Sequence, residues 1–169
     1  MDATALRALQ APIKDRYRED PDAAVITLKA QGTLDDQAIA CKVETGRALA
    51  VAGLHPATGG SGIELCSGDM LLEALVACAG VTLKAVATAL EIPLASGTVR
   101  AEGDLDFRGT LGVDKGAPVG FRAIRLTFEV DTDAPQEKID QLLKLTERYC
   151  VVFQTLNTKP ELGVELLRG

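Results

Sequence analysis

The sequence has no tryptophan, few other aromatic residues and a single histidine. It contains four Phe and two Tyr among 169 residues, so the core must be built mainly from Ala, Val and Leu. His55 alone cannot form a multi-histidine metal site. None of the four cysteines is spaced as Cys-x-x-Cys, the pattern that would indicate a zinc site. The sequence therefore predicts no metal centre.

Basic residues are outnumbered by acidic ones. The 18 Lys and Arg against 24 Asp and Glu give a net charge of −6, which argues against a nucleic-acid-binding surface. Residues 1–20 are charged and lack the apolar run of a signal peptide, so a cytoplasmic location is expected. In that reducing compartment cysteines are more often catalytic, metal-binding or simply buried than joined in structural disulfides. The cysteines whose roles are to be assigned are Cys41, Cys66, Cys78 and Cys150.

Residues 66–90 form the longest apolar stretch. Ser67 and Asp69 at its start are typical of a helix N-terminus. Apolar residues then surround the helix axis almost completely, which is typical of a buried helix. Such a stretch is long enough to cross a bilayer, but Glu73 and Lys84 interrupt it and Ala and Gly dominate it. We expect a central core helix and no membrane partner.

The remaining elements follow from hydrophobic periodicity and turn residues. A helix in two pieces around Pro12 is expected over 3–19, then strands at 24–31 and 37–44 joined by a turn at 32–36, with 47–52 extending the second strand or adding another. After the central helix we expect strands at 96–107 and 121–131, a helix from a capping box at Asp133 and Gln136 to Tyr149, a helical turn at 151–156 and a closing strand at 163–167. This order predicts an α+β protein with a mostly antiparallel sheet, a helical extension over 1–22 and one domain over 23–169.

Taken alone, each cysteine is interpreted as a buried or half-buried small hydrophobe. Reactivity requires a thiolate, and Cys78 lies too far into its helix for the helix N-terminus to stabilise one. Cys66 lies near that N-terminus, but roughly 18 Å along the axis from Cys78. We interpret Cys66 as a loop cysteine and Cys41 as a core residue of a strand.

Two segments nevertheless resemble the motifs of a known family. The segment Gly68–Cys78, followed by Thr82 and Leu83, resembles the first cysteine motif of the OsmC/Ohr family, in which an acidic residue and a run of Leu and Ala precede the cysteine. The segment Glu147–Leu156 resembles its second motif, usually Cys-Pro-Val-x-x-Thr-Leu. The expected order of strands and helices matches the family over about residues 24–167.

The resemblance implies a fold and a function. It implies an intertwined homodimer with its active sites at the subunit interface, acting as a thiol-dependent peroxidase on organic hydroperoxides or hydrogen peroxide. Cys78 would be the peroxidatic thiolate, and Cys150 would resolve its sulfenic acid as a disulfide. An external dithiol would reduce that disulfide, and no bound cofactor is implied.

The sequence departs from the family pattern at three positions. Asp69 stands where a longer Glu is common, and nine residues of helix separate it by about 13 Å from its own Cys78, so a pairing would need the partner subunit. The turn that carries a thiolate-holding Arg in the Ohr branch has none here, and Arg47 is the substitute we select. Val151 replaces the usual Pro. These departures favour an OsmC-like branch over Ohr itself.

Two other functions remain open on these residues. The fold could serve a non-catalytic protein that binds a small lipophilic ligand in an apolar cleft. Alternatively, Cys66 or Cys78 could be oxidised in a redox sensor that does not turn over.

Overall fold

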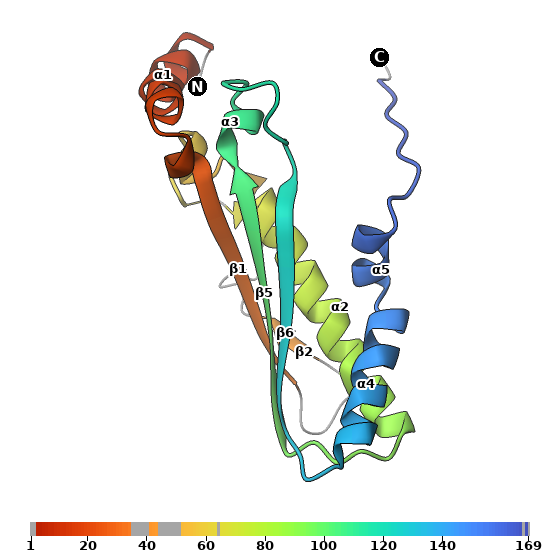
Figure 1. Ribbon diagram of the computed structural model, residues 1–169. Coiled ribbons are helices and arrows are strands. Elements are labelled where there is room, and N and C mark those ends of the chain that lie inside the picture. The colour runs from red at the N-terminus through yellow and green to blue at the C-terminus, as the bar shows by residue number, and fades with distance from the viewer. Residues whose placement is uncertain (1–2, 35–40, 44–51, 64, 167, 169) are drawn as a thin grey trace.

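The computed structural model describes residues 3–34, 41–43, 52–63, 65–166 and 168 (Figure 1). In chain order its helices are α1 (Ala3–Glu19), η1 (Pro21–Ala24), η2 (Pro56–Thr58), α2 (Ser67–Ala89), α3 (Phe107–Thr110), α4 (Gln136–Tyr149) and α5 (Val151–Asn157). Its strands are β1 (Val25–Leu34), β2 (Cys41–Val43), β3 (Ala52–Gly53), β4 (Leu65–Cys66), β5 (Ser96–Asp106) and β6 (Phe121–Asp131). The α+β class expected from the sequence is confirmed.

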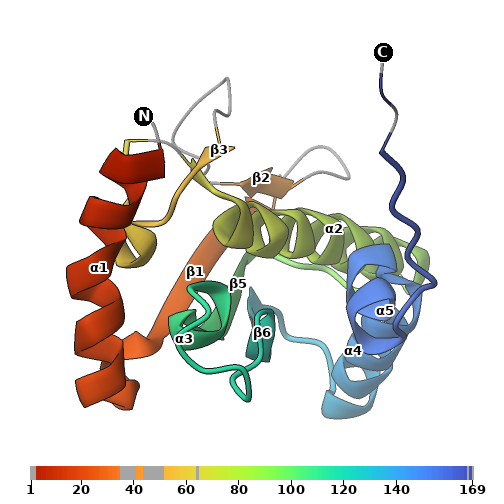
Figure 2. The ribbon, with the colours of Figure 1, turned by 90° about the horizontal axis from the view of Figure 1, so that it is seen from above.

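The main sheet has the strand order β2-β1-β5-β6 and is antiparallel throughout. β1 and β5 pair from Val25 opposite Asp106 to Thr33 opposite Thr98. β3 and β4 form a separate, parallel pair just before α2. The long helix α2 lies across one face of the main sheet, so the fold has two layers (Figure 2).

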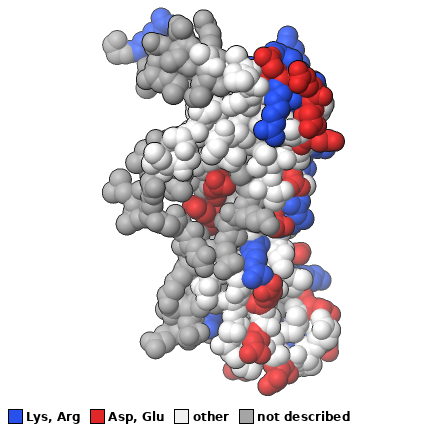
Figure 3. Space-filling view, turned by 90° about the vertical axis from the view of Figure 1, so that its left-hand side faces the viewer, with Lys and Arg blue, Asp and Glu red and all other residues white. Residues whose placement is uncertain are grey.

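Alternation along β5 assigns one sheet face to the core and the other to water. Val99, Ala101 and Leu105 are buried beneath α2. Between them, Arg100 pairs with Glu129 of β6, and Arg125 of β6 pairs with Asp104 at 2.5 Å. Charged side chains accordingly gather along the right-hand margin of the space-filling view (Figure 3).

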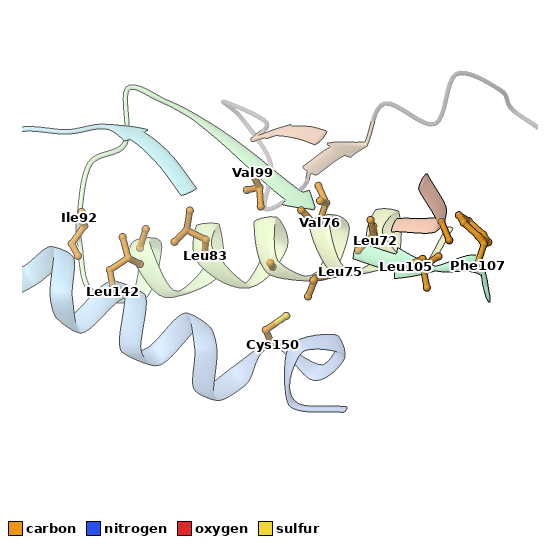
Figure 4. Close-up of a cluster of buried hydrophobic side chains, with 14 of the residues drawn as sticks. Leu72, Leu75, Val76, Leu83, Ile92, Val99, Leu105, Phe107, Leu142 and Cys150 are labelled. Carbon is orange, nitrogen blue, oxygen red and sulfur yellow. The ribbon is translucent and has the colours of Figure 1, made fainter. Parts of the chain in front are cut away.

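Helix α2 is the central element that the sequence predicted. It is long and apolar enough to span a membrane by length and composition, yet seven of its residues are buried in the core. Small residues on the buried face let the sheet approach closely. Figure 4 shows the resulting cluster along α2. The buried residues of α2 are Leu72, Leu75, Val76, Ala79, Gly80, Leu83 and Ala87.

Gly103 shows how tight this packing is. It is a buried strand residue of β5, and a Cβ placed there would lie 2.4 Å from the Phe121 ring and 3.3 Å from Leu72. Glycine is therefore required for the close approach of the ring of Phe121 to β5.

Two helix starts differ from the sequence prediction. Cys66, not Ser67, is the N-cap of α2, and it makes no side-chain capping hydrogen bond. The capping box predicted for α4 does not form, because α4 begins one residue after Pro135 and the Pro135 carbonyl accepts from the Lys138 N–H at 2.9 Å. Proline fits a helix entry, where its missing N–H costs nothing.

The N-terminal helix is one piece rather than two. Pro12 lies inside α1, which continues to Glu19. Tyr17 is buried, and its hydroxyl donates to the Ala57 carbonyl at 2.9 Å. Helix α1 thus packs on the η2 segment, while the division of the chain at residue 22 stays a prediction.

Strand boundaries differ at both ends of the chain. β1 runs through Leu34, so the turn predicted to begin at Gly32 does not begin there. The predicted strand at 163–167 is not a strand over its described residues 163–166. The remainder of the predicted strands at 37–44 and 47–52, outside β2 and Ala52, falls outside the described residues.

Leu142 tests the contribution of α4 to this core. It is 2% exposed, whereas its neighbour Leu143 is 42% exposed. We expect Leu142→Ala to lower the free energy of unfolding by about 2–5 kcal/mol, because it removes buried methyl groups and leaves a cavity. Leu143→Ala should cost much less, and urea denaturation compares the two. Equal losses would contradict the packing of α4 described here.

Candidate active site

Two cysteines meet where α2 packs against the junction of α4 and α5. Cys78 lies in the middle of α2 and is half-buried, whereas Cys150 is only 1% exposed. The Cys150 N–H donates to the Thr146 carbonyl, and the Cys150 carbonyl accepts from the Gln154 N–H, both at 2.9 Å. This residue therefore has a fixed backbone between two helices, and its sulfur points toward α2 (Figure 4).

The Cys78 sulfur lies among hydrogen-bond donors. Burial raises the pKa of this thiol, but hydrogen bonds from the Val152 N–H, the Cys150 thiol, the Val151 N–H and the Thr82 hydroxyl outweigh burial, so that the pKa is lowered overall. All four donors are neutral. Among the described residues, the groups that lower the pKa of Cys78 are thus backbone amides, a hydroxyl and a thiol.

The pKa of Cys150 is shifted in the opposite direction. Burial, together with the neighbouring Cys78, raises the pKa of Cys150 to about 11, although the Phe153 and Val152 N–H groups act against this shift. The opposite directions of the two pKa shifts favour Cys78 as the thiolate of the pair and Cys150 as the protonated thiol.

Such a pair can perform thiol–disulfide chemistry. The thiolate form is the nucleophile, and a second thiol in hydrogen-bonding contact can attack an oxidised sulfur without a large movement. Cys66, Cys78 and Cys150 are all free thiols in the structure.

An apolar groove of about 540 Å³ opens between α2, β6 and α5. Its lining includes Leu75, three residues before Cys78, and Phe153, three residues after Cys150, but neither cysteine. Arg122 and Asn157 are its polar members. The other lining residues are Leu71, Gly120, Phe121, Ala123, Ile124, Leu126 and Leu156.

The other two predicted site residues are not brought to Cys78. Arg47 lies outside the described residues, and its role stays a prediction. Asp69 lies nine residues before Cys78 on the continuous helix α2, which places it about 13 Å away along the axis. Its charge interacts with His55 instead: burial raises the pKa of Asp69, and the charge of His55 acts in the opposite direction.

His55 was passed over in the sequence analysis. Its ring stacks on Phe107 with centroids 4.8 Å apart, and its Nδ1 accepts from the Ala57 N–H at 3.0 Å. Together with Cys66 it lines a second groove of about 410 Å³, which shares Leu71, Gly120 and Phe121 with the first. No sequence motif predicts the stacking of His55 on Phe107, because the two residues lie far apart in the sequence.

The sequence analysis also missed the donors to Cys78. Thr82 lies one helical turn beyond Cys78, a spacing that puts both side chains on one face of the helix, and this signal was available. The amides of Val151 and Val152 carry no sequence signal, because every residue except proline has one. Across the part of the chain that the structure describes, no group of three His, Cys, Asp or Glu residues could hold a metal ion.

The single histidine makes the charge interaction between His55 and Asp69 measurable. Burial lowers the pKa of His55, and the charge of Asp69 partly restores it. We expect the one histidine C2 proton resonance to titrate below the ordinary value, and Asp69→Asn to lower the midpoint further because the protonated ring loses its carboxylate. A proton NMR titration measures both. Glu73→Gln is the matched control, and an unchanged midpoint in Asp69→Asn would show that the two side chains do not face each other.

Comparison with known proteins gives a consistent result. A family profile described as OsmC-like protein matches residues 59–165, which include both cysteine segments. No curated protein matches the sequence.

Solved structures similar to this one include two OsmC-like proteins. An OsmC-like hydroperoxide resistance protein from Jannaschia sp. CCS1 has a TM-score of 0.61 and 16% identity, and the match covers 86% of this chain and 95% of that one. An OsmC-like protein from Mycoplasma pneumoniae has a TM-score of 0.54 and 17% identity, over 80% of this chain and 86% of that one. At these identities the likeness shows the fold alone. Since the family profile spans well over half of the sequence, this chain belongs to the OsmC-like protein family.

Proposed function

We propose that this protein is a thiol-dependent peroxidase that reduces organic hydroperoxides or hydrogen peroxide through Cys78 and Cys150. The observation that carries the proposal is the asymmetry of the pair: the pKa of Cys78 is lowered and that of its hydrogen-bonded partner Cys150 is raised. Membership of the OsmC-like family supports it, as does the fold shared with a hydroperoxide resistance protein.

The proposed reaction begins with attack by the Cys78 thiolate on one peroxide oxygen. The O–O bond breaks, Cys78 becomes a sulfenic acid, and the alkoxide or hydroxide that leaves takes up a proton. The Cys150 thiol, already a donor to Cys78, is the proton source we assign. Its thiolate then attacks the Cys78 sulfur and displaces hydroxide, which forms a disulfide. An external dithiol supplies the two electrons that restore both thiols.

The groove beside the thiols favours an organic substrate. Its walls are mostly apolar side chains from three elements, and its volume lies within the range of small-molecule sites. The same groove also supports the alternative of a non-catalytic protein for a small lipophilic ligand. The hydrogen bonds to Cys78 favour the peroxidase, because a binding protein has no need of a stabilised thiolate.

The decisive experiment is intact-mass analysis of the reduced protein after one equivalent of cumene hydroperoxide. We expect the wild-type protein to lose two hydrogens as Cys78 and Cys150 join. Cys78→Ser should not react in this way, and Cys150→Ser should carry a sulfenic or further oxidised Cys78.

Each other outcome has a defined meaning. If Cys150→Ser still forms a disulfide, Cys66 or Cys41 is the resolving residue and Cys150 is not. If Cys78 is oxidised in the wild type but a dithiol cannot restore it, the redox sensor is the better function. An unchanged wild-type mass would refute peroxidase activity and favour the lipophilic-ligand protein.

We also propose that the protein acts as a homodimer in the cytoplasm, where free thiols persist. Apolar side chains are exposed on the side of the molecule opposite the charged sheet face. Val81 on α2 is 39% exposed and Val151 on α5 is 70% exposed, and Val164 near the C-terminus is fully exposed. A second copy packing on this side would cover them. The intertwined arrangement and any contribution of Arg47 or Asp69 across the interface belong to this proposal.

The proposed dimer predicts different effects for a charge introduced on the exposed apolar side and for one introduced on the charged sheet face. Val81→Arg should shift the protein to the monomer, because it places a cation in an apolar interface. Thr127→Glu, exposed on the charged face of β6 beside Arg100, should leave the dimer intact. Size-exclusion chromatography with light scattering measures both masses. A monomeric wild-type protein, or a dimeric Val81→Arg variant, would contradict the proposed interface.

A further inference from the structure

The face of α2 that carries Cys78 forms one wall of both grooves. Leu75 and Leu71 precede Cys78 by three and seven residues, a spacing that places the three side chains on one face of a helix. Leu75 lines the first groove, of about 540 Å³, and Leu71 lines both the first and the second. Cys66 and Gly68, at the start of α2, line the second groove, of about 410 Å³. The two grooves therefore follow each other along the helix, away from Cys78.

The close-up of the core shows the same order. Its labelled residues follow α2 in the sequence Cys150, Leu75, Leu105 and Phe107 (Figure 4). Leu75 belongs to the first groove, and Leu105 and Phe107 belong to the second. Seven residues of helix separate Leu71, where the grooves meet, from Cys78. A molecule held at Cys78 and extended along α2 thus reaches the boundary between the grooves after about 10 Å.

The ring of Phe121 stands at this boundary. Phe121 lines both grooves together with Leu71 and Gly120, and it has the largest side chain of the three. A Cβ placed at Gly103 would lie 2.4 Å from this ring and 3.3 Å from Leu72 of α2. The ring therefore packs where a side chain of β5 would otherwise lie, next to α2, and it separates the two grooves.

A β-bulge turns Phe121 toward the grooves. Phe121 is opposite Leu105 and Ala123 is opposite Asp104, so Arg122 is an extra residue in β6. Leu105 is buried beneath α2, and Phe121 opposite it faces the same side of the sheet. Asp104 belongs to the charged face, and so does Ala123 opposite it. In a regular strand, residues two apart share a face, so without the bulge the Phe121 ring would point to the charged face.

We propose that Phe121 is a specificity-determining residue, which limits the unbranched alkyl chain of an organic hydroperoxide to the first groove. The inference rests on the proposed function for the identity of this ligand. With its peroxide at Cys78, such a molecule lays its chain past Leu75 and ends at the Phe121 ring. Removal of the ring joins the grooves, since their shared wall loses its largest side chain. The apolar residues then open to a longer chain are Leu54, Leu105, Phe107 and Val119.

Unbranched alkanols test this limit without a reaction at sulfur. Each is the reduced product of the alkyl hydroperoxide with the same chain. Isothermal titration calorimetry measures their dissociation constants, from n-butanol to n-dodecanol. With the wild-type protein, affinity should rise about fourfold for each added methylene, the gain expected when one CH₂ group is buried. It should then level off at the chain length that reaches Phe121.

Two variants open the boundary and one serves as a control. Phe121→Ala should move the levelling-off to longer alkanols. Leu71→Ala should act in the same direction, and it should cost the fold little because Leu71 is 37% exposed. Phe128→Ala is the matched control, since Phe128 lies on the same strand but lines a separate groove of about 270 Å³. Affinity for this control should level off at the wild-type chain length.

His55 gives a second readout, because it lines the second groove and is the only histidine in the sequence. In Phe121→Ala, an alkanol longer than the wild-type limit should shift the His55 C2 proton resonance. The same alkanol should leave this resonance unchanged in the wild type and in Phe128→Ala. The shift would place the end of the chain beyond the boundary, which a general loosening of the fold would not do.

The inference fails if the folded Phe121→Ala and Leu71→Ala proteins level off at the wild-type chain length, or if Phe128→Ala changes as much as Phe121→Ala. It also fails if the wild type binds no alkanol, or if its affinity still rises at n-dodecanol. The peroxidase can fail separately, because alkanol binding needs no peroxide. A chain-length limit set by Phe121 in a protein inert to cumene hydroperoxide would keep Phe121 as the limit for a lipophilic ligand and refute the peroxidase.

Discussion

The packing of α2 against the α4–α5 junction is the constraint on which the rest of the site depends. It brings Cys78, from the middle of one helix, against Cys150, which is held between two others by backbone hydrogen bonds to Thr146 and Gln154. Two chemically identical thiols thereby acquire opposite electrostatic character. Cys78 gathers donors while half-exposed, and Cys150 is buried with few. A small shift of α5 would remove amides from the sulfur and leave burial, which disfavours the thiolate.

The two faces of the sheet have different roles. One is covered by α2, with small residues in the helix and Gly103 in the strand permitting close approach. The other presents ion pairs such as Arg125 with Asp104 to water. This division leaves the exposed apolar residues of α2 and α5 beside the thiols. The groove and the proposed dimer surface consequently lie on the same side of the molecule as the two cysteines.

The similar solved structures share this fold at low sequence identity. They share it at 16–17% identity, because burial patterns tolerate many substitutions of comparable volume. A site is less tolerant, since each hydrogen bond depends on one atom.

The sequence by itself determined the α+β order, a central helix within 66–90 and the two cysteine segments, because periodicity and apolar length are local properties. It did not determine the continuity of α1 through Pro12, the N-cap at Cys66 or the extent of β1, since the ends of elements depend on packing with the rest of the chain. Nor could it show what surrounds Cys78. The pairing of Cys78 with Cys150, like the stacking of His55 on Phe107, joins residues distant in sequence. Only the tertiary structure decided which groups surround the Cys78 thiol, because no sequence pattern specifies the distance between two atoms.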